Sequence, residues 1–286
     1  VGDIMRSVAD GFSNRLEIDG YELARYLQLE GQRNLTKVHK HRYAVDKLAR
    51  EREKSQVFYF ASDSVFLEWL KQDHRVVCMG RDAVPRNRAE LKAKVWRCVR
   101  NSRFVHRVIG RVFADRRHKP NHLLWMGGRS VQSKLLSELK NRGFKISLLQ
   151  NDFDRALDFA KRGFKFELLR IRSPRRFKEQ WHHLEQCYGQ GLETIVSKTG
   201  LKSSLLKLTL QLDKNHLMNL LRVLNILEDN KTMLGLLLVE QSVIGAEALA
   251  VDFCNRHGLP SLEVLHGIPA GFPIESGNTT IVAVCG

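Results

Sequence analysis

The sequence has few residues of the kinds that mark disulfide-bonded, metal-bound or membrane-spanning proteins. Its five cysteines are scattered along 286 residues, and no two of them form a CxxC pair. This spacing predicts neither a disulfide framework nor a zinc site, and it favours a reducing, cytoplasmic compartment. The longest apolar run, LGLLLV at 234–239, has the length of a strand. It falls far short of the roughly 20 residues that cross a bilayer.

The histidines do not form a pattern typical of metal ligands. His182 and His183 are adjacent, so on a helix their side chains point about 100° apart. His39 and His41 lie in a charged segment that we expect to be helical and solvated. We therefore expect no metal and no bound cofactor. The chain begins Val-Gly-Asp without an initiator methionine, which we read as the start of a fragment.

Positive charge is abundant and concentrated. The net charge is +16, and thirteen Lys and Arg stand against three Asp and Glu between Arg81 and Lys119. Apolar residues three and four apart within 86–119 predict amphipathic helices with a basic face. Such a face fits nucleic acid, phosphorylated ligands or an anionic membrane, with Trp96 and Phe104 as anchors, although an ordinary solvated face explains it equally well. The polyanion-contacting residues would be Arg97, Arg100, Arg103, Arg107 and Arg111.

Strands and helices are expected to alternate along most of the chain. Good helix formers predict a helical segment over 15–54, and 175–229 reads as mainly helical. Helices that end at Gly143, Gly163 and near Gly258 separate apolar runs. The expected strands are 56–62, 74–80, 122–126, 144–150, 164–171, 232–240, 259–267 and 279–286.

This alternation predicts an α/β fold with a Rossmann-like, mostly parallel sheet covered by helices on both faces, preceded by additional N-terminal helices. We expect three regions. Residues 1–55 would form a helical segment and 56–270 the Rossmann-like domain. Residues 271–286 would begin a linker or a truncated second domain.

Ligands in such folds bind beyond the carboxyl ends of the strands. One candidate loop follows strand 122–126, where two glycines let a backbone approach a ligand. It lacks both the GxGxxG and the Walker lysine patterns, and a tight turn that needs glycine explains it as well. Its candidate substrate-binding residues are Gly127, Gly128, Arg129 and Ser130.

Two further loops carry candidate catalytic residues. Glu240 ends a very apolar strand, and Gly245 would let the following helix pack closely. The candidates for substrate binding in these two loops are Gly245, Glu247 and Gly267. Helix capping by Glu240, Ser242 or Glu247 is the structural alternative. His266 ends the strand LEVL and is followed by Gly267. An imidazole there would serve as general base or would donate a hydrogen bond to phosphate oxygens.

Residues 232–286 resemble bacterial surface-polysaccharide transferases with a GT-B-like fold. In these, a strand ending in a polar residue precedes a Gly/Ala-rich helix, a Gly-Leu-Pro strand, a Gln-His-Gly box and a strand of the form I-x-V-W-G. The resemblance covers about 55 of 286 residues. CDP-glycerol glycerophosphotransferase-like and capsule-polysaccharide transferases carry variants of this pattern. Here Leu265 replaces the Gln of the box and Cys285 replaces the Trp.

The resemblance implies an acceptor-side domain, with the donor domain beyond residue 286. His266 and Gly267 match the box, and His266 would line the cleft between the domains, flanked by Glu240 and Gly245. The implied donor is a nucleotide-sugar or a CDP-linked compound, and the implied acceptor is a polysaccharide or a lipid-linked glycan. The implied location is cytoplasmic, at the inner face of the plasma membrane.

Two alternatives remain open on the sequence alone. A nucleic-acid-binding protein explains the basic segment but not the glycine-rich strand ends, and no helix-turn-helix, zinc finger or RNA-recognition pattern is present. A nucleotide-sugar epimerase would use the same fold, since non-hydrolysing 2-epimerases share this architecture with a different box.

Overall fold

The computed structural model describes most of the chain from residue 122 onward and short segments before it. Strands 57–59 and 76–78 and residues 265 and 266 are described by their backbone. The chain divides into two compact units, which we describe separately: Val1–Lys92 with Gln180–Leu217, and Ala93–Glu179 with Met218–Gly286. The described residues are 7–8, 11–12, 15–26, 36, 39–40, 43–44, 46–48, 50–51, 57–59, 76–78, 122–126, 133–149, 153–200, 214–240, 242, 245–266 and 279–285.

The second unit is built on a six-stranded parallel sheet. Its spatial order is β10-β9-β8-β5-β6-β7, and every neighbouring pair runs parallel. Counted along the chain within this sheet, the order is 6-5-4-1-2-3, which is the order of doubly wound nucleotide-binding folds. The strands are β5 (His122–Trp125), β6 (Lys145–Leu149), β7 (Glu167–Leu169), β8 (Leu234–Val239), β9 (Ser261–His266) and β10 (Ile281–Cys285).

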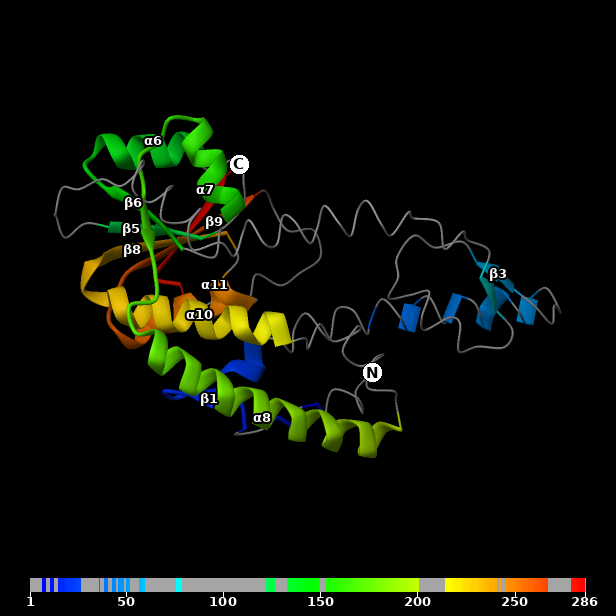
Figure 1. Ribbon diagram of the computed structural model, residues 1–286. Helices are drawn as coiled ribbons and strands as arrows, with labels where there is room; N and C mark the ends of the chain where they lie inside the picture. Colours follow the sequence, from blue (N-terminus) through cyan, green and yellow to red (C-terminus); the bar gives the residue numbers. More distant parts are fainter. Residues whose placement is uncertain are drawn as a thin grey trace. The chain divides into compact units, whose positions relative to one another are not determined.

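Helices cover both faces of this sheet (Figure 1). The helices α6 (Ser133–Asn141) and α7 (Phe153–Lys161) lie on one face. The helices α10 (Lys214–Asn230) and α11 (Gly245–Arg256) lie on the other, and the 3₁₀ helix η1 (Lys231–Met233) leads into β8. The sequence-based expectation of an α/β fold with a parallel sheet between two helical layers is confirmed.

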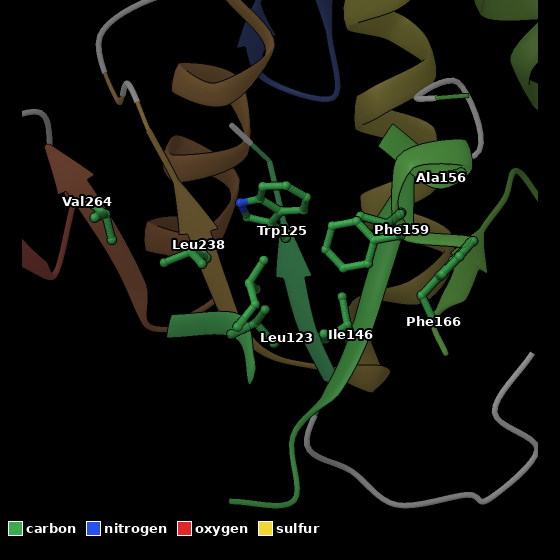
Figure 2. Close-up of a cluster of buried hydrophobic side chains, with 10 residues drawn as sticks. Leu123, Trp125, Ile146, Ala156, Phe159, Phe166, Leu238 and Val264 are labelled. Atoms are coloured by element: carbon green, nitrogen blue, oxygen red, sulfur yellow. The ribbon is translucent and has the colours of Figure 1, made fainter. Parts of the chain in front are cut away.

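An apolar cluster holds α6 and α7 against the sheet (Figure 2). Trp125 of β5 packs against Phe159 of α7 with ring centroids 4.8 Å apart. Because neighbouring side chains of a strand point to opposite faces, alternate residues of each strand reach this layer. The buried members are Leu123, Trp125, Leu136, Ile146, Leu148, Ala156, Phe159, Phe166, Leu238 and Val264.

The first unit contains short strands and the main part of α8 (Pro174–Thr199), from Gln180 onward. The strands β3 (Val57–Tyr59) and β4 (Val76–Cys78) pair in parallel, as a βαβ unit predicts, but form a sheet of their own.

The expectation of continuous helix over 15–54 is wrong at its start. The strands β1 (Glu17–Ile18) and β2 (Tyr21–Glu22) form an antiparallel hairpin there. Asp19 and Gly20 connect them with φ values of 52° and 79°. Positive φ at both central residues is the geometry of a type I′ turn, for which Asp-Gly is a strong signal. The prediction of helix over 15–54 was based on helix propensity and did not take this dipeptide into account.

Close packing in the first unit depends on a glycine of α8. A Cβ at Gly191 would lie 2.5 and 2.6 Å from ring carbons of Phe12 and 2.8 Å from the Gly11 carbonyl oxygen. Phe12 in turn stacks on Tyr188 with centroids 5.9 Å apart. A methyl group at position 191 would therefore push this aromatic pair apart.

We expect Gly191→Ala to lower the free energy of unfolding by about 1–3 kcal/mol, because it overpacks the Phe12 contact. Gly189→Ala is the matched control, since a Cβ there meets nothing within 4 Å. It should raise stability by roughly 0.5–1 kcal/mol through helix propensity alone. Urea denaturation measures both variants, and equal effects would contradict the packing described here.

Candidate functional site

The candidate site is the carboxyl edge of the parallel sheet, at the reversal of strand order between β5 and β8. Ligands of open α/β sheets bind at this switch point. The backbone N–H of Met126, just past β5, donates to the Leu238 carbonyl of β8 at 2.8 Å. The two loops that the sequence marks as candidates, one from Gly127 and one from Glu240, therefore leave the sheet from neighbouring strands.

His266 is the last residue of β9, as expected. Val239, the last residue of β8, pairs with Glu263, so His266 lies three residues further along β9. At the same level it pairs with Cys285 of the parallel strand β10. The backbone thus places His266 at the carboxyl edge beside β8.

Several predicted residues lie outside the described part of the chain. For these residues the predictions rest on the sequence alone. They concern Gly127, Gly128, Arg129, Ser130 and Gly267, and the basic residues Arg97, Arg100, Arg103, Arg107 and Arg111.

Glu240 and Glu247 are joined across the β8–α11 loop. The backbone N–H of Glu240 donates to Glu247 Oε2 at 3.0 Å, and both side chains are half-buried. Glu247 belongs to the first turn of α11 and reaches back to the end of β8. This contact supports the structural interpretation of Glu247 that the sequence left open beside substrate binding.

A second carboxylate holds the same loop from β9. The backbone N–H of Ser242 donates to Glu263 Oε1 at 2.9 Å, and its hydroxyl donates to Glu263 Oε2 at 2.6 Å. Both residues are only 5% exposed. Thr279, which precedes β10, adds a hydroxyl 3.5 Å from the same carboxylate. A carboxylate buried in this way is stable only when its oxygens accept hydrogen bonds, so the loop and the strand position each other.

The expectation for Gly245 needs a correction. We expected it to let α11 pack closely, but a Cβ at this position would meet nothing within 4 Å. Its φ of +62° explains the residue instead. The chain turns through the left-handed region where it enters α11, and glycine adopts that conformation without a steric penalty.

Arg155 brings positive charge to the other side of the switch point. It lies in the first turn of α7, which follows β6, and its Nη1 donates to the carbonyl oxygen of Trp125 at 3.2 Å. The guanidinium carbon stands 4.7 Å from the centroid of the Trp125 ring. Such stacking contributes about 0.5–1 kcal/mol and fixes the plane of the guanidinium group.

A serine, a histidine and a glutamate also meet near the amino end of β5, but they do not form a catalytic triad. Ser147 Oγ lies 2.9 Å and Glu167 Oε2 lies 3.6 Å from the same ring atom, Nδ1 of His122. A triad needs the hydroxyl on one ring nitrogen and the carboxylate on the other. Ser147 is also completely buried. This cluster therefore has a structural role in the sheet.

The buried Cys254 offers no activated thiol. Cys187 and Cys254 are both free, and burial raises the pKa of the Cys254 thiol to about 12. This thiol is therefore protonated at physiological pH and does not act as a nucleophile.

The described ranges contain neither a cluster of metal ligands nor a candidate membrane span. No three His, Cys, Asp or Glu side chains there gather closely enough to hold a metal ion. None of the helices in those ranges has the length and apolar character of a membrane span.

Comparison with models of known protein families, with curated proteins and with solved structures found no match. The site is therefore interpreted from its own geometry. Sequence reasoning predicted Glu240 and His266 at strand ends, which is where the structure places them, but it did not select Arg155 or Glu263. Glu263 had a signal, because it is a charged residue within the apolar strand SLEVLH, which parallel pairing buries. Arg155 had none, since it is one arginine among many in a basic chain.

Removing the Ser242 hydroxyl should destabilise the second unit by about 1–3 kcal/mol, because it leaves the buried Glu263 carboxylate short of a donor. Thr232→Val is the control, since it removes an exposed hydroxyl. It should change the free energy of unfolding by less than about 0.5 kcal/mol. Chemical denaturation of Ser242→Ala and Thr232→Val measures the loss of unfolding free energy in each variant. A loss in Ser242→Ala no larger than that in Thr232→Val would show that the Ser242–Glu263 contact does not hold the loop.

Proposed function

We propose that this chain carries the acceptor-side lobe of a transferase that moves a sugar or glycerophosphate from a nucleotide-activated donor. The acceptor is a polysaccharide or a lipid-linked glycan of the cell surface. The observation that carries the proposal is the switch point between β5 and β8, with Glu240 directly after β8 and His266 at the end of the adjacent parallel strand β9. The transferase assignment itself rests on the resemblance of residues 232–286 to surface-polysaccharide transferases.

The chemistry requires one group that accepts a proton from the acceptor hydroxyl. As the hydroxyl oxygen bonds to the anomeric carbon or to phosphorus of the donor, its proton passes to the carboxylate of Glu240 or the imidazole of His266. The bond from the donor to its leaving phosphate breaks, and the nucleotide leaves with the electron pair. Positive groups at the edge stabilise the charge that develops on that phosphate.

The protein also has to keep the base in position. Glu247 holds the backbone N–H of Glu240, and Glu263 holds the next turn of the loop through Ser242. One contact comes from α11 and the other from strand β9 of the sheet. Together they hold the backbone at Glu240 in place. A base fixed before the ligand arrives needs no reorganisation during the reaction.

Incubation of the full protein with nucleotide-sugars, CDP-glycerol and glycan acceptors, followed by mass spectrometry, tests the proposal. We expect transfer to the acceptor and a loss of kcat of about 100-fold or more in Glu240→Gln or His266→Asn, the range typical of a lost general base. Glu138→Gln and His257→Asn are the controls, because Glu138 pairs with Arg142 at the surface and His257 contacts Glu228, both away from the edge. Unchanged kcat in both edge variants would contradict the assigned roles.

The same incubation separates the transferase from the epimerase alternative. An epimerase would convert one nucleotide-sugar into its isomer without any acceptor present. Isomerisation with no transfer product would therefore replace the transferase proposal while leaving the location of the site unchanged.

The basic segment 86–119 supports a location at the cytoplasmic face of the membrane, where its arginines would meet anionic lipid. We expect the protein to float with vesicles containing phosphatidylglycerol and to detach as the salt concentration rises, because salt screens this attraction. Neutral vesicles are the control. Salt-sensitive retention on DNA or RNA with no binding to anionic vesicles would instead favour the nucleic-acid alternative.

A further inference from the structure

The two sides of the switch point carry opposite charge. On the β8 side, three acidic residues gather at the start of the β8–α11 loop: Glu240 itself, Glu247, which accepts from the Glu240 backbone N–H, and Glu263, which accepts from Ser242. On the β5 side, the guanidinium of Arg155 is attached to Trp125, the last residue of that strand. A ligand lying across this edge therefore meets a negative side and a positive side.

The contacts of Arg155 fix both the place and the plane of its charge. One Nη atom donates to the Trp125 carbonyl oxygen at 3.2 Å, and the group lies over the indole ring at 4.7 Å from its centroid. Trp125 is itself buried and packed against Phe159, so the surface beneath the guanidinium is rigid. A planar guanidinium held in this way keeps one orientation, and its forked donors match the paired oxygens of a phosphate.

We propose that Arg155 binds a phosphate group of the ligand, and that the hydroxyl-bearing part of the ligand lies toward β8. The β8 side suits a phosphate less well, because the amides of Glu240 and Ser242 already donate to the protein's own carboxylates, which also repel an anion. Carboxylates suit hydroxyl groups, which donate hydrogen bonds to them. The inference rests on the proposed function for the identity of the ligand, but not for the phosphate contact itself.

Two sources supply the same chemistry: the diphosphate of a nucleotide-activated donor and the phosphate of a lipid-linked acceptor. Steady-state kinetics distinguishes them. In Arg155→Met, a raised KM for the donor alone assigns the contact to the donor, and a raised KM for the acceptor alone assigns it to the acceptor. An unchanged KM for both overturns the proposal.

Binding of inorganic pyrophosphate to the full protein, measured by calorimetry, tests the contact without any activity. We expect Arg155→Met to weaken binding by about 10- to 100-fold, as the loss of a charge-assisted hydrogen bond does. Arg155→Lys should lose less, because it keeps the charge but not the planar fork. Arg162→Met is the control, since Arg162 directly follows the same helix and pairs with Asp158 at the surface.

Thermal unfolding accompanies each binding measurement, because Arg155 also covers Trp125. Methionine retains most of the apolar contact, so Arg155→Met should keep its melting temperature. Failure of the wild-type protein to bind pyrophosphate at millimolar concentration, or equal binding by a folded Arg155→Met, overturns the proposal. Pyrophosphate binding that depends on Arg155 in a protein without transfer activity would retain the phosphate site and remove the transferase.

Discussion

Parallel pairing of all six strands is the constraint on which the second unit depends. Because every strand runs in the same direction, all carboxyl ends meet at one edge, and residues far apart in the sequence become neighbours there. Trp125 and Glu240 are more than a hundred positions apart, yet β5 and β8 are hydrogen-bonded neighbours. The reversal of strand order at this pair makes the helices after β5 and β8 leave toward opposite faces, which is where this class of fold accommodates ligands.

Polar contacts then decide what the edge can do. The β8–α11 loop is held by two carboxylates, one from α11 and one from β9, so the backbone amides of Glu240 and Ser242 are occupied by the protein itself. The opposite strand end carries a stacked guanidinium. In our proposal, this division of charge would orient a ligand that has both phosphate and hydroxyl groups, with Glu240 on the side of the hydroxyl.

Much of the fold was predictable because its signals are local. The helices α6 and α7 end just before Gly143 and Gly163, and β8, α11 and β9 fall within the expected ranges, since apolar runs and glycine positions mark them directly. Strand order was not predictable, because it depends on which strands pair across long separations. The hairpin at Asp19-Gly20 was missed because good helix formers on both sides outweighed a two-residue turn signal.

The candidate site was predictable only in part. Glu240 and His266 follow from their positions at strand ends, which the sequence marks. The partners that define their surroundings do not follow from it. Glu263 reaches Ser242 across two neighbouring strands, and Arg155 reaches Trp125 from the next helix, so each contact exists only after the sheet has assembled.

Hydrogen–deuterium exchange of the full protein, with and without the donor or acceptor that it uses, tests most directly whether the ligand lies at the switch point. Our account predicts slower exchange in peptides that follow β5 and β8, around residues 126–130 and 241–246. Protection confined to the amino edge of the sheet, near His122 and Glu167, or to the first unit would contradict it.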